Sequence, residues 1–320
     1  MKSPRYLGWI AAGAMLLTTP GFSQMSKPTT TTMQEGRGTT IVTVLPKKDD
    51  EPLTVRPQNL TITVDGKPST VTNLVPLRDA PTELVILIDN SARDVGRYFE
   101  DIRKFVQQRP ANTKVALAYM ESGSANLATP LTADHDKALS GLRLTTGTPG
   151  SSASPYFCIS DLARRWPSDD STARRLVVVI TNGIDPYTSS VSPNNPNVAR
   201  AVADSARAGM VVNTIYLPIP GMGQRMPLVA DSGRNLLSML ASGTGGGSFW
   251  MGNSAPVSIT PFFRDISQRI ENQFGLSFTA QLKHEGEVLP LAVKTDAPQF
   301  KVEAPEQVFV GVEGVKANPN

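Results

Sequence analysis

Hydrophobic residues form one short unbroken run early in the chain, Leu84–Ile88, and polar residues follow it directly, among them Asp89 and Ser91. A run of this kind is typical of a strand buried on both faces, as in a parallel sheet flanked by helices. Ligands of open α/β sheets bind just beyond the carboxyl ends of such strands. The segment therefore predicts a central strand, with a candidate binding site at its end.

Strand-like and helix-like patterns alternate from this run onward, which indicates repeated strand–helix–strand units. The expected strands are Leu84–Asp89, Lys114–Met120, Arg175–Thr181, Met210–Leu217 and Ser248–Met251. The expected helices are Val95–Gln108, His135–Leu142, Tyr156–Arg165, Asn197–Ala208, Asn235–Ala241 and Pro261–Asn272. We therefore predict an α/β domain over residues 81–272 with a doubly wound, mostly parallel, Rossmann-like sheet.

Alternating patterns at both ends of this domain predict short β segments. After a polar, Thr-rich linker (24–40), residues 41–80 form a small β unit with a hairpin turn at Asp65-Gly66. A second β segment covers residues 273–313 with a turn at Glu285-Gly286, and a tail (314–320) follows. We expect the two β segments to pack into one module beside the α/β domain.

The first 23 residues have the pattern of a secretory signal peptide. Lys2 and Arg5 precede an apolar core (Ile10–Leu17) that is too short to span a membrane, and Gly21–Ser23 offers a small-x-small cleavage site. Its removal lowers the formal net charge from +3 to +1, which argues against nucleic-acid binding. With one cysteine in 320 residues there is no internal disulfide, as in many periplasmic proteins. We expect a secreted or periplasmic protein without a membrane span after signal cleavage.

The strand Leu84–Asp89 resembles the first strand of a von Willebrand factor type A domain, and Asp65-Gly66-Lys67-Pro68 resembles a hairpin that precedes this domain in secreted bacterial proteins. The resemblance covers residues 40 to 312. It implies an Asp-x-Ser-x-Ser sequence at the strand end, whose oxygens belong to a magnesium-type adhesion site. Here Asp89 and Ser91 match, but Arg93 replaces the last serine. A guanidinium cannot ligate a cation and would repel one.

Two further loops of the resembled family supply ligands. The second should present a threonine before a helix, and Ser154 is the best match here, with Thr148 as a rival. The third should read Asp-Gly after its strand. This chain has Asn182 in place of the acid, while Asp185 survives three residues later. The implied metal set is thus Asp89, Ser91, Ser154, Asn182 and Asp185, a degenerate site with weakly bound Mg²⁺ or Mn²⁺, or with no cofactor.

Simpler roles are open for each of these residues. Asp89 and Ser91 can cap the following helix, and Asn182-Gly183 can be an ordinary turn. Arg93 can pair with Asp89 or Asp185, so that an internal salt bridge replaces the cation.

We expect an exported, non-enzymatic module that binds a protein partner. In the resembled family a carboxylate of the partner completes the coordination of the ion; here Arg93 itself can meet an acidic group instead. The Pro- and Gly-rich loop Pro218–Asp231 is either a contact surface or a disordered insertion.

The alternatives are a hydrolase that uses Asp89 or Cys158, and a structural subunit of a cell-envelope assembly bound through the β module. Neither His135 nor His284 lies in a nucleophile or zinc motif. Gly243–Gly247 follows a helix and precedes a strand, the reverse of the order that phosphate loops require.

Overall fold

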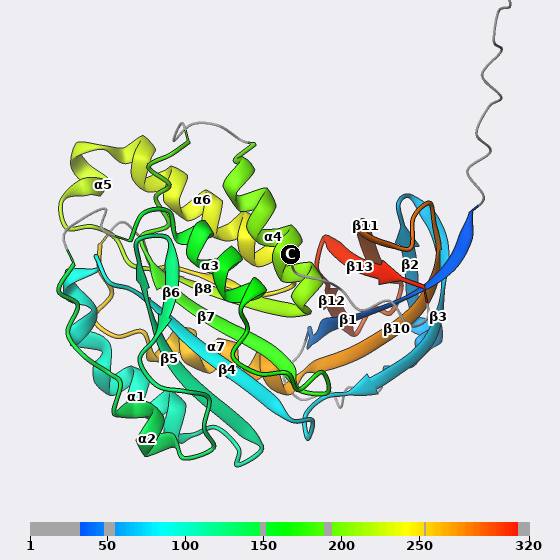
Figure 1. Cartoon of the computed structure of the whole chain (residues 1–320), viewed down its shortest axis with the longest axis horizontal. Helices are drawn as coiled ribbons and strands as arrows, with labels where there is room; N and C mark the ends of the chain where they lie inside the picture. The colour runs from blue at the N-terminus through cyan, green and yellow to red at the C-terminus, as the bar shows by residue number, and fades with distance from the viewer. Residues whose placement is uncertain (1–32, 48–54, 148–151, 189–193, 253, 313–320) are drawn as a thin grey trace, which may run out of the picture. The chain divides into compact units, whose positions relative to one another are not determined.

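The computed structural model describes residues 33–47, 55–147, 152–188, 194–252 and 254–312. The expected signal peptide, the tail after residue 313 and Thr148 lie outside these residues. The described chain contains a six-stranded mixed sheet with helices on both faces and a seven-stranded antiparallel sheet (Figure 1).

The mixed sheet has the strand order β6-β5-β4-β7-β8-β9. Its strands are β4 (Thr82–Asp89), β5 (Thr113–Glu121), β6 (Ser124–Leu127), β7 (Arg174–Thr181), β8 (Met210–Tyr216) and β9 (Ser248–Phe249). All pairings are parallel except that of β6, which returns antiparallel to β5. All eight residues of β4 are buried, as its apolar run predicts. Because β4 lies between β5 and β7, its carboxyl end is next to theirs.

Helices pack on both faces of the mixed sheet. They are the 3₁₀-helix η2 (Arg93–Tyr98), α1 (Phe99–Gln107), α2 (His135–Leu139), α3 (Pro155–Arg164), α4 (Pro196–Ala208), α5 (Met222–Arg225), α6 (Pro227–Thr244) and α7 (Thr260–Glu271). Alternate β4 side chains enter two hydrophobic cores: Leu84 and Ile86 join residues of α1 and α7, whereas Val85 and Leu87 join residues of α3, α4 and α6. None of the described helices is long and apolar enough to cross a membrane.

The antiparallel sheet closes on itself. Six strands follow one another in the order β10-β3-β2-β11-β13-β1, and β1 pairs with β10 to complete the ring. The strands are β1 (Gln34–Pro46), β2 (Leu60–Val64), β3 (Lys67–Pro76), β10 (Gln273–Leu282), β11 (Gly286–Thr295), β12 (Phe300–Glu303) and β13 (Gln307–Gly311), with a short 3₁₀-helix η1 (Pro57–Asn59) before β2. Strand β12 pairs with β1. The interior is a separate hydrophobic core that includes Val42, Ile62, Phe278 and Val310.

This closed barrel corrects the predicted fold class. A doubly wound, mostly parallel sheet with short β segments at its ends is wrong for the chain as a whole, because the end segments form a barrel of their own and the α/β sheet is mixed. The closing pair joins β1 and β10, which lie more than 200 residues apart, through ten paired positions. Pairing over such a separation leaves no local pattern in the sequence.

Strand β1 also begins inside the range expected to be a polar linker, at Gln34. Its inward positions there are Gly36 and Gly38, so the strand has no apolar alternation to reveal it. An added Cβ would lie 2.3 Å from Leu282 at Gly36 and 2.4 Å from Phe278 at Gly38. These glycines are needed because large side chains of β10 fill the space beside them.

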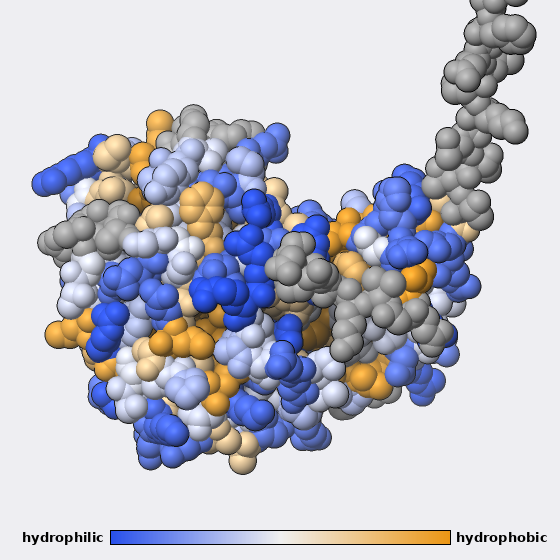
Figure 2. Space-filling model, in the orientation of Figure 1, coloured by the Kyte–Doolittle hydropathy of each residue, from blue (hydrophilic) through white to orange (hydrophobic). Residues whose placement is uncertain are grey.

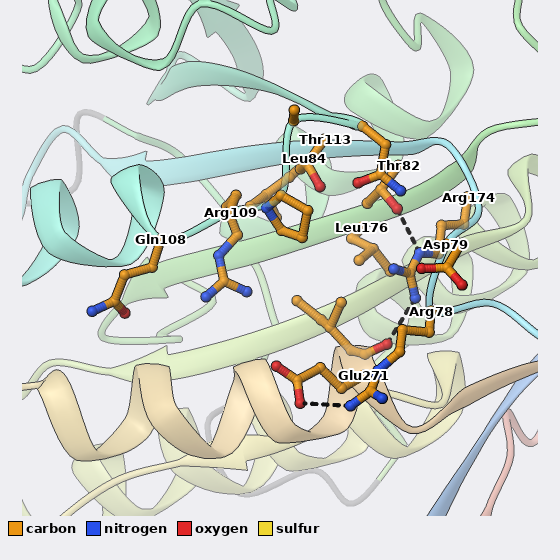
Figure 3. A pocket seen from close by; sticks show the side chains of 14 residues that line it. Arg78, Asp79, Thr82, Leu84, Gln108, Arg109, Thr113, Arg174, Leu176 and Glu271 are labelled. Atoms are coloured by element: carbon orange, nitrogen blue, oxygen red, sulfur yellow. Dashed lines mark hydrogen bonds and ion pairs between the residues drawn. The ribbon is translucent and has the colours of Figure 1, made fainter.

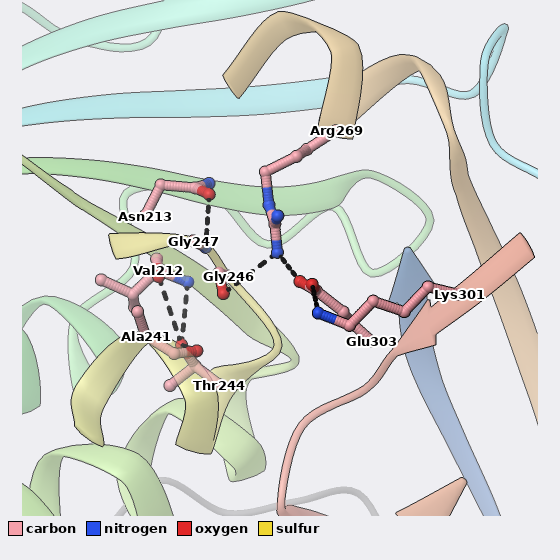
Figure 4. A network of polar contacts seen from close by, with 9 residues as sticks. All are labelled: Val212, Asn213, Ala241, Thr244, Gly246, Gly247, Arg269, Lys301 and Glu303. Carbon is pink, nitrogen blue, oxygen red and sulfur yellow. Dashed lines mark hydrogen bonds and ion pairs between the residues drawn. The ribbon is translucent and has the colours of Figure 1, made fainter. Parts of the chain in front are cut away.

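The barrel and the α/β domain meet at a charged contact (Figure 4). Arg269 on α7 pairs with Glu303 on β12 and donates a hydrogen bond of 3.3 Å to the carbonyl of Gly246. Lys301 donates to the other oxygen of Glu303 at 2.7 Å. Burial would raise the pKa of Glu303, but the hydrogen bond from Lys301 and the charge of Arg269 outweigh it and hold that pKa below its ordinary value.

Candidate functional site

The candidate site lies where β4 and β7 end side by side. The register pairs Ile88 with Ile180, so that the next residues, Asp89 and Thr181, are neighbours at the carboxyl edge of the sheet. Both side chains are buried, with 3 % of Asp89 and none of Thr181 exposed. We call the connections that follow the carboxyl ends of β4, β7, β8 and β9, together with the 143–147 segment that packs on the first of them, the carboxyl edge.

The carboxylate of Asp89 is an acceptor for three neighbouring residues. Its Oδ1 accepts from the backbone N–H of Ser91 at 2.9 Å, from Ser91 Oγ at 2.6 Å and from Ser152 Oγ at 2.5 Å. Its Oδ2 accepts from Thr181 Oγ1 at 2.7 Å. The four hydrogen bonds compensate the buried charge with protein donors alone.

Two of these donors, Ser152 and Thr181, were not among the residues predicted for the site. Thr181 had a signal in the sequence, since aligning Leu84–Asp89 with Leu176–Thr181 as neighbouring strands places it beside Asp89. Ser152 had none, because its position depends on a left-handed backbone at Ala153, φ 57°, and on the contact of its carbonyl with the N–H of Gly123.

Ser154, predicted as the second-loop ligand, precedes α3 at its N-terminus. Its hydroxyl is fully buried and has no hydrogen-bond partner among the described atoms. No hydrogen bond connects it to Asp89; within the described part of this loop, Ser152 makes that contact.

In the third loop, Asn182 and Asp185 act within their own segment. Asn182 Oδ1 accepts from the N–H of Ile184 at 3.0 Å, the geometry of a turn. Asp185 Oδ2 accepts from the amides of Asn195 at 2.9 Å and Asn197 at 2.8 Å, which ties the loop to the start of α4. Burial would raise the pKa of Asp185, but these hydrogen bonds hold it below the ordinary value. The carboxylate of Asp185 therefore stabilises this loop.

Arg93 begins η2, directly after the Asp89 turn. Its side chain lies outside the described part of the structure, so the predicted salt bridge with Asp89 or Asp185 stays a prediction.

The residues at this edge do not fit a tightly bound divalent cation. Among the described residues the site has a single carboxylate, that of Asp89, and both of its oxygens already accept hydrogen bonds. The second acidic position is Asn182, which is engaged in its own turn. Mg²⁺ is usually held by one or two carboxylates with further oxygen ligands. Within the described residues, no group of three or more His, Cys, Asp or Glu side chains is placed to hold a metal ion.

Cys158 lies on α3 beneath the site and is fully buried. Desolvation, followed by the charges of Asp89 and Asp161, raises the pKa of its thiol to about 12. The thiol is therefore protonated at neutral pH, whereas the thiolate is the nucleophilic form.

Large hydrophobic side chains stand exposed around the carboxyl edge. Seven of the eleven exposed large hydrophobic residues in the described chain lie there, although loops are ordinarily polar. They are Leu144, Tyr187, Met226, Leu228, Trp250, Met251 and Val257. Leu144 belongs to this edge because the neighbouring Thr145 donates to the carbonyl of Ala92 at 2.7 Å. Figure 2 shows hydrophobic residues at the surface over the α5 end of the α/β domain.

No protein-family model matches the chain, and neither does any curated protein. Among solved structures, an aerotolerance-related membrane protein from Bacteroides fragilis NCTC 9343, with multiple mutations to serines, is 20 % identical; the match covers 59 % of this chain and 98 % of that chain with a TM-score of 0.40. The VWA domain of SpRpn10 is 15 % identical over 58 % of this chain and 93 % of its own, with a TM-score of 0.38.

Proximal thread matrix protein 1 from the mussel byssus, solved with a zinc-occupied metal-ion-dependent adhesion site, is 12 % identical. The match covers 64 % of this chain and 48 % of that chain with a TM-score of 0.45. A von Willebrand factor A domain is thus among the matched structures.

Proposed function

We propose that this protein is an exported, non-enzymatic module that binds a protein partner through the carboxyl edge of its α/β domain. The observation that carries the proposal is the gathering of exposed hydrophobic side chains on four different connecting segments of the chain, including the start of α6. Exposed apolar groups that converge on one edge are typical of a protein contact surface. The connection after β8 contributes Met226 and, from the first turn of α6, Leu228. This favours the contact surface, one of the two roles left open for Pro218–Asp231.

Partner binding is proposed to be independent of metal. The hydrogen bonds to Asp89 support this, because a carboxylate satisfied by Ser91, Ser152 and Thr181 needs no cation to offset its burial. Mg²⁺ or Mn²⁺, if bound at all, is expected to bind weakly.

Arg93 keeps its proposed role as a contact for an acidic group of the partner. Its backbone at the start of η2 belongs to the carboxyl edge, and a guanidinium pairs well with a carboxylate.

The absence of catalysis is part of the proposal, and the environment of Cys158 supports it. A buried thiol with a raised pKa lacks both the access and the thiolate that a nucleophile requires. The carboxylate of Asp89 is buried and accepts hydrogen bonds from Ser91, Ser152 and Thr181, so it is not placed to act as a base on a bound substrate.

The test places a photoreactive amino acid at Leu228 or Val257 on the carboxyl edge, with Lys294 on strand β11 of the barrel as the matched exposed control. We expect the same cross-linked adduct from both edge positions in producing cells and none from the control. Adducts from Lys294 alone would assign the contact to the barrel, as a structural envelope subunit requires, and would refute the proposal.

Metal dependence is measured on the same adducts. The yield at Leu228 should be unchanged by EDTA and should fall for Arg93→Ser. An adduct that disappears in EDTA would show that the edge depends on a cation.

A further inference from the structure

A cavity of about 450 Å³ lies at the opposite end of the mixed sheet, where the parallel strands begin (Figure 3). The first residues of three neighbouring strands line it, Thr82 of β4, Thr113 of β5 and Arg174 of β7, which the register places side by side. The ends of α1 and α7 complete the walls with Arg109 and Glu271. The cavity is therefore built from the ends of regular elements.

Arg174 is a buried cation without a buried anion. Only 8 % of it is exposed, and its guanidinium donates to neutral acceptors: Nε to Thr82 Oγ1 at 2.6 Å, and Nη1 to the carbonyl of Ile270 at 2.8 Å and to Gln273 Oε1 at 2.9 Å. Nη2 donates to none of the described residues, and no described carboxylate lies within ion-pair distance of the group. Burying a charge without an opposite charge is costly.

Arg109 is a second guanidinium at the same cavity. Its Nε donates to the carbonyl of Phe105 at 3.0 Å and its Nη2 to Ser267 Oγ at 2.7 Å, and its guanidinium carbon lies 4.3 Å from the centre of the Phe105 ring. These contacts fix its orientation, yet no described carboxylate pairs with it.

The electrostatics of the two arginines agree with this geometry. Desolvation and, second to it, repulsion by the charge of Arg109 together lower the pKa of Arg174 to about 10. Desolvation also lowers the pKa of Arg109, partly offset by Glu271. Both groups are charged at neutral pH and repel each other across the cavity.

The acidic residues at the rim do not cancel this charge. Glu271 pairs with Arg78 at 3.5 Å, and both side chains are more than half exposed. Asp79 is exposed as well. The lining thus holds three arginines and two acids, and the deeper residues are the cations.

We propose that this cavity binds a small organic anion, whose carboxylate or phosphate group is held by Arg109 and Arg174. Planar guanidiniums match the oxygens of both groups with paired hydrogen bonds. The volume exceeds that of a bare oxyanion and lies in the range of small-molecule sites, so the cavity has room for the rest of the ligand.

Calorimetry of the full chain with inorganic phosphate and with succinate, at ionic strength matched by chloride, tests the proposal. We expect saturable one-to-one binding of at least one probe, and the tighter of the two identifies the group that the site prefers. Binding of neither probe up to about 10 mM, an affinity near the weak limit for specific sites, would overturn the proposal.

Arg109→Gln removes one charge and should weaken binding by about tenfold or more. Arg103→Gln is the matched control, because Arg103 lies on α1, just before Arg109 in the chain, pairs with Glu100 at 3.6 Å and does not line the cavity. Equal affinity for Arg109→Gln and the wild type would refute the site. Arg109 is preferred over Arg174 for this test because the three hydrogen bonds of Arg174 tie β4, α7 and β10 together, so that its loss would disturb more of the fold.

Discussion

Replacing Asp89 by alanine tests whether the carboxyl edge is held together by its own hydrogen bonds. The substitution removes the acceptor of four hydrogen bonds and leaves the hydroxyls of Ser152 and Thr181 buried. Hydrogen bonds to charged groups contribute about 1.5–3 kcal/mol each. Two changes offset part of this loss: the buried charge disappears, and Ser152 can still donate to the carbonyl of Met120 at 3.2 Å.

We therefore expect Asp89→Ala to lower the free energy of unfolding by about 3 kcal/mol. Asp89→Asn is the matched control. Its Oδ1 keeps the bonds from Ser91 and Ser152, and its amide can donate to the hydroxyl of Thr181, so that the cost should be about 1 kcal/mol.

Urea unfolding followed by circular dichroism, once in EDTA and once with about 10 mM Mg²⁺, separates the hydrogen-bond network from a metal site. A cation bound with a dissociation constant of about 0.1 mM would stabilise the wild type by about 2.7 kcal/mol, and this gain would vanish in Asp89→Ala. We expect the same difference between the two proteins in both buffers. A cost below about 1 kcal/mol in EDTA would refute the hydrogen-bond reasoning, and a cost that grows with Mg²⁺ would refute the metal-independent interpretation.

Three further predictions follow from burial and charge. Cys158 should react with iodoacetamide only after unfolding, because its pKa is raised to about 12; rapid labelling of the folded protein would reveal a reactive thiolate. The folded-state pKa of Glu303 is below its ordinary value of 4.5, so its contribution to stability is present above that value and is lost as the pH falls through the folded-state pKa. Urea titrations from about pH 6 to about pH 3 should therefore show a shallower loss of stability for Glu303→Gln than for the wild type, and equal slopes would contradict the pairing. A Cβ at Gly246 would lie 2.0 Å from the carbonyl oxygen of Val212, so Gly246→Ala should cost about 3 kcal/mol, seen as a lower melting temperature; an unchanged one would mean that the backbone relaxes freely.

The α/β elements were predictable because their buried apolar residues recur along the chain with the spacing of strands and helices. Every expected strand from Leu84 onward overlaps an observed one, and β4 is buried over its whole length as its apolar run indicates. The helix α6 begins at Pro227, eight residues before the expected start at Asn235, since proline at the first helical position is tolerated and hides the start in a Pro-rich segment.

The barrel was not predictable in the same way. Its strands were visible, and so was the turn at Asp65-Gly66, where the register pairs Val64 with Lys67. Closure depends on which distant strands pair, and the inward glycines of β1 carry no hydrophobic signal. A search for alternating apolar residues thus misses inward positions occupied by glycine, where a side chain of the neighbouring strand fills the space.

The candidate site was also predictable only in part. Asp89 and Ser91 were predicted from the strand end and do lie together, whereas the donor from the second loop is Ser152, whose position follows from tertiary contacts. Ser154 was favoured because it directly precedes a helix, and it does occupy that position. Spacing along the chain locates an element boundary; it does not determine which of two nearby hydroxyls turns toward the carboxylate.

The charge balance at the two ends of the mixed sheet argues for different ligands at each. At the carboxyl edge the carboxylate of Asp89 is buried and hydrogen-bonded, Asn182 is neutral, and seven large hydrophobic side chains are exposed. Such a surface gains affinity by removing hydrophobic area from water, which suits a protein partner. At the other end Arg109 and Arg174 are desolvated cations without a described counter-ion, and only an anion would relieve their repulsion. Because the sites lie at opposite ends of the same strands, substitutions at Arg109 should leave the cross-linking of Leu228 unchanged. A changed yield would show that the two sites are coupled.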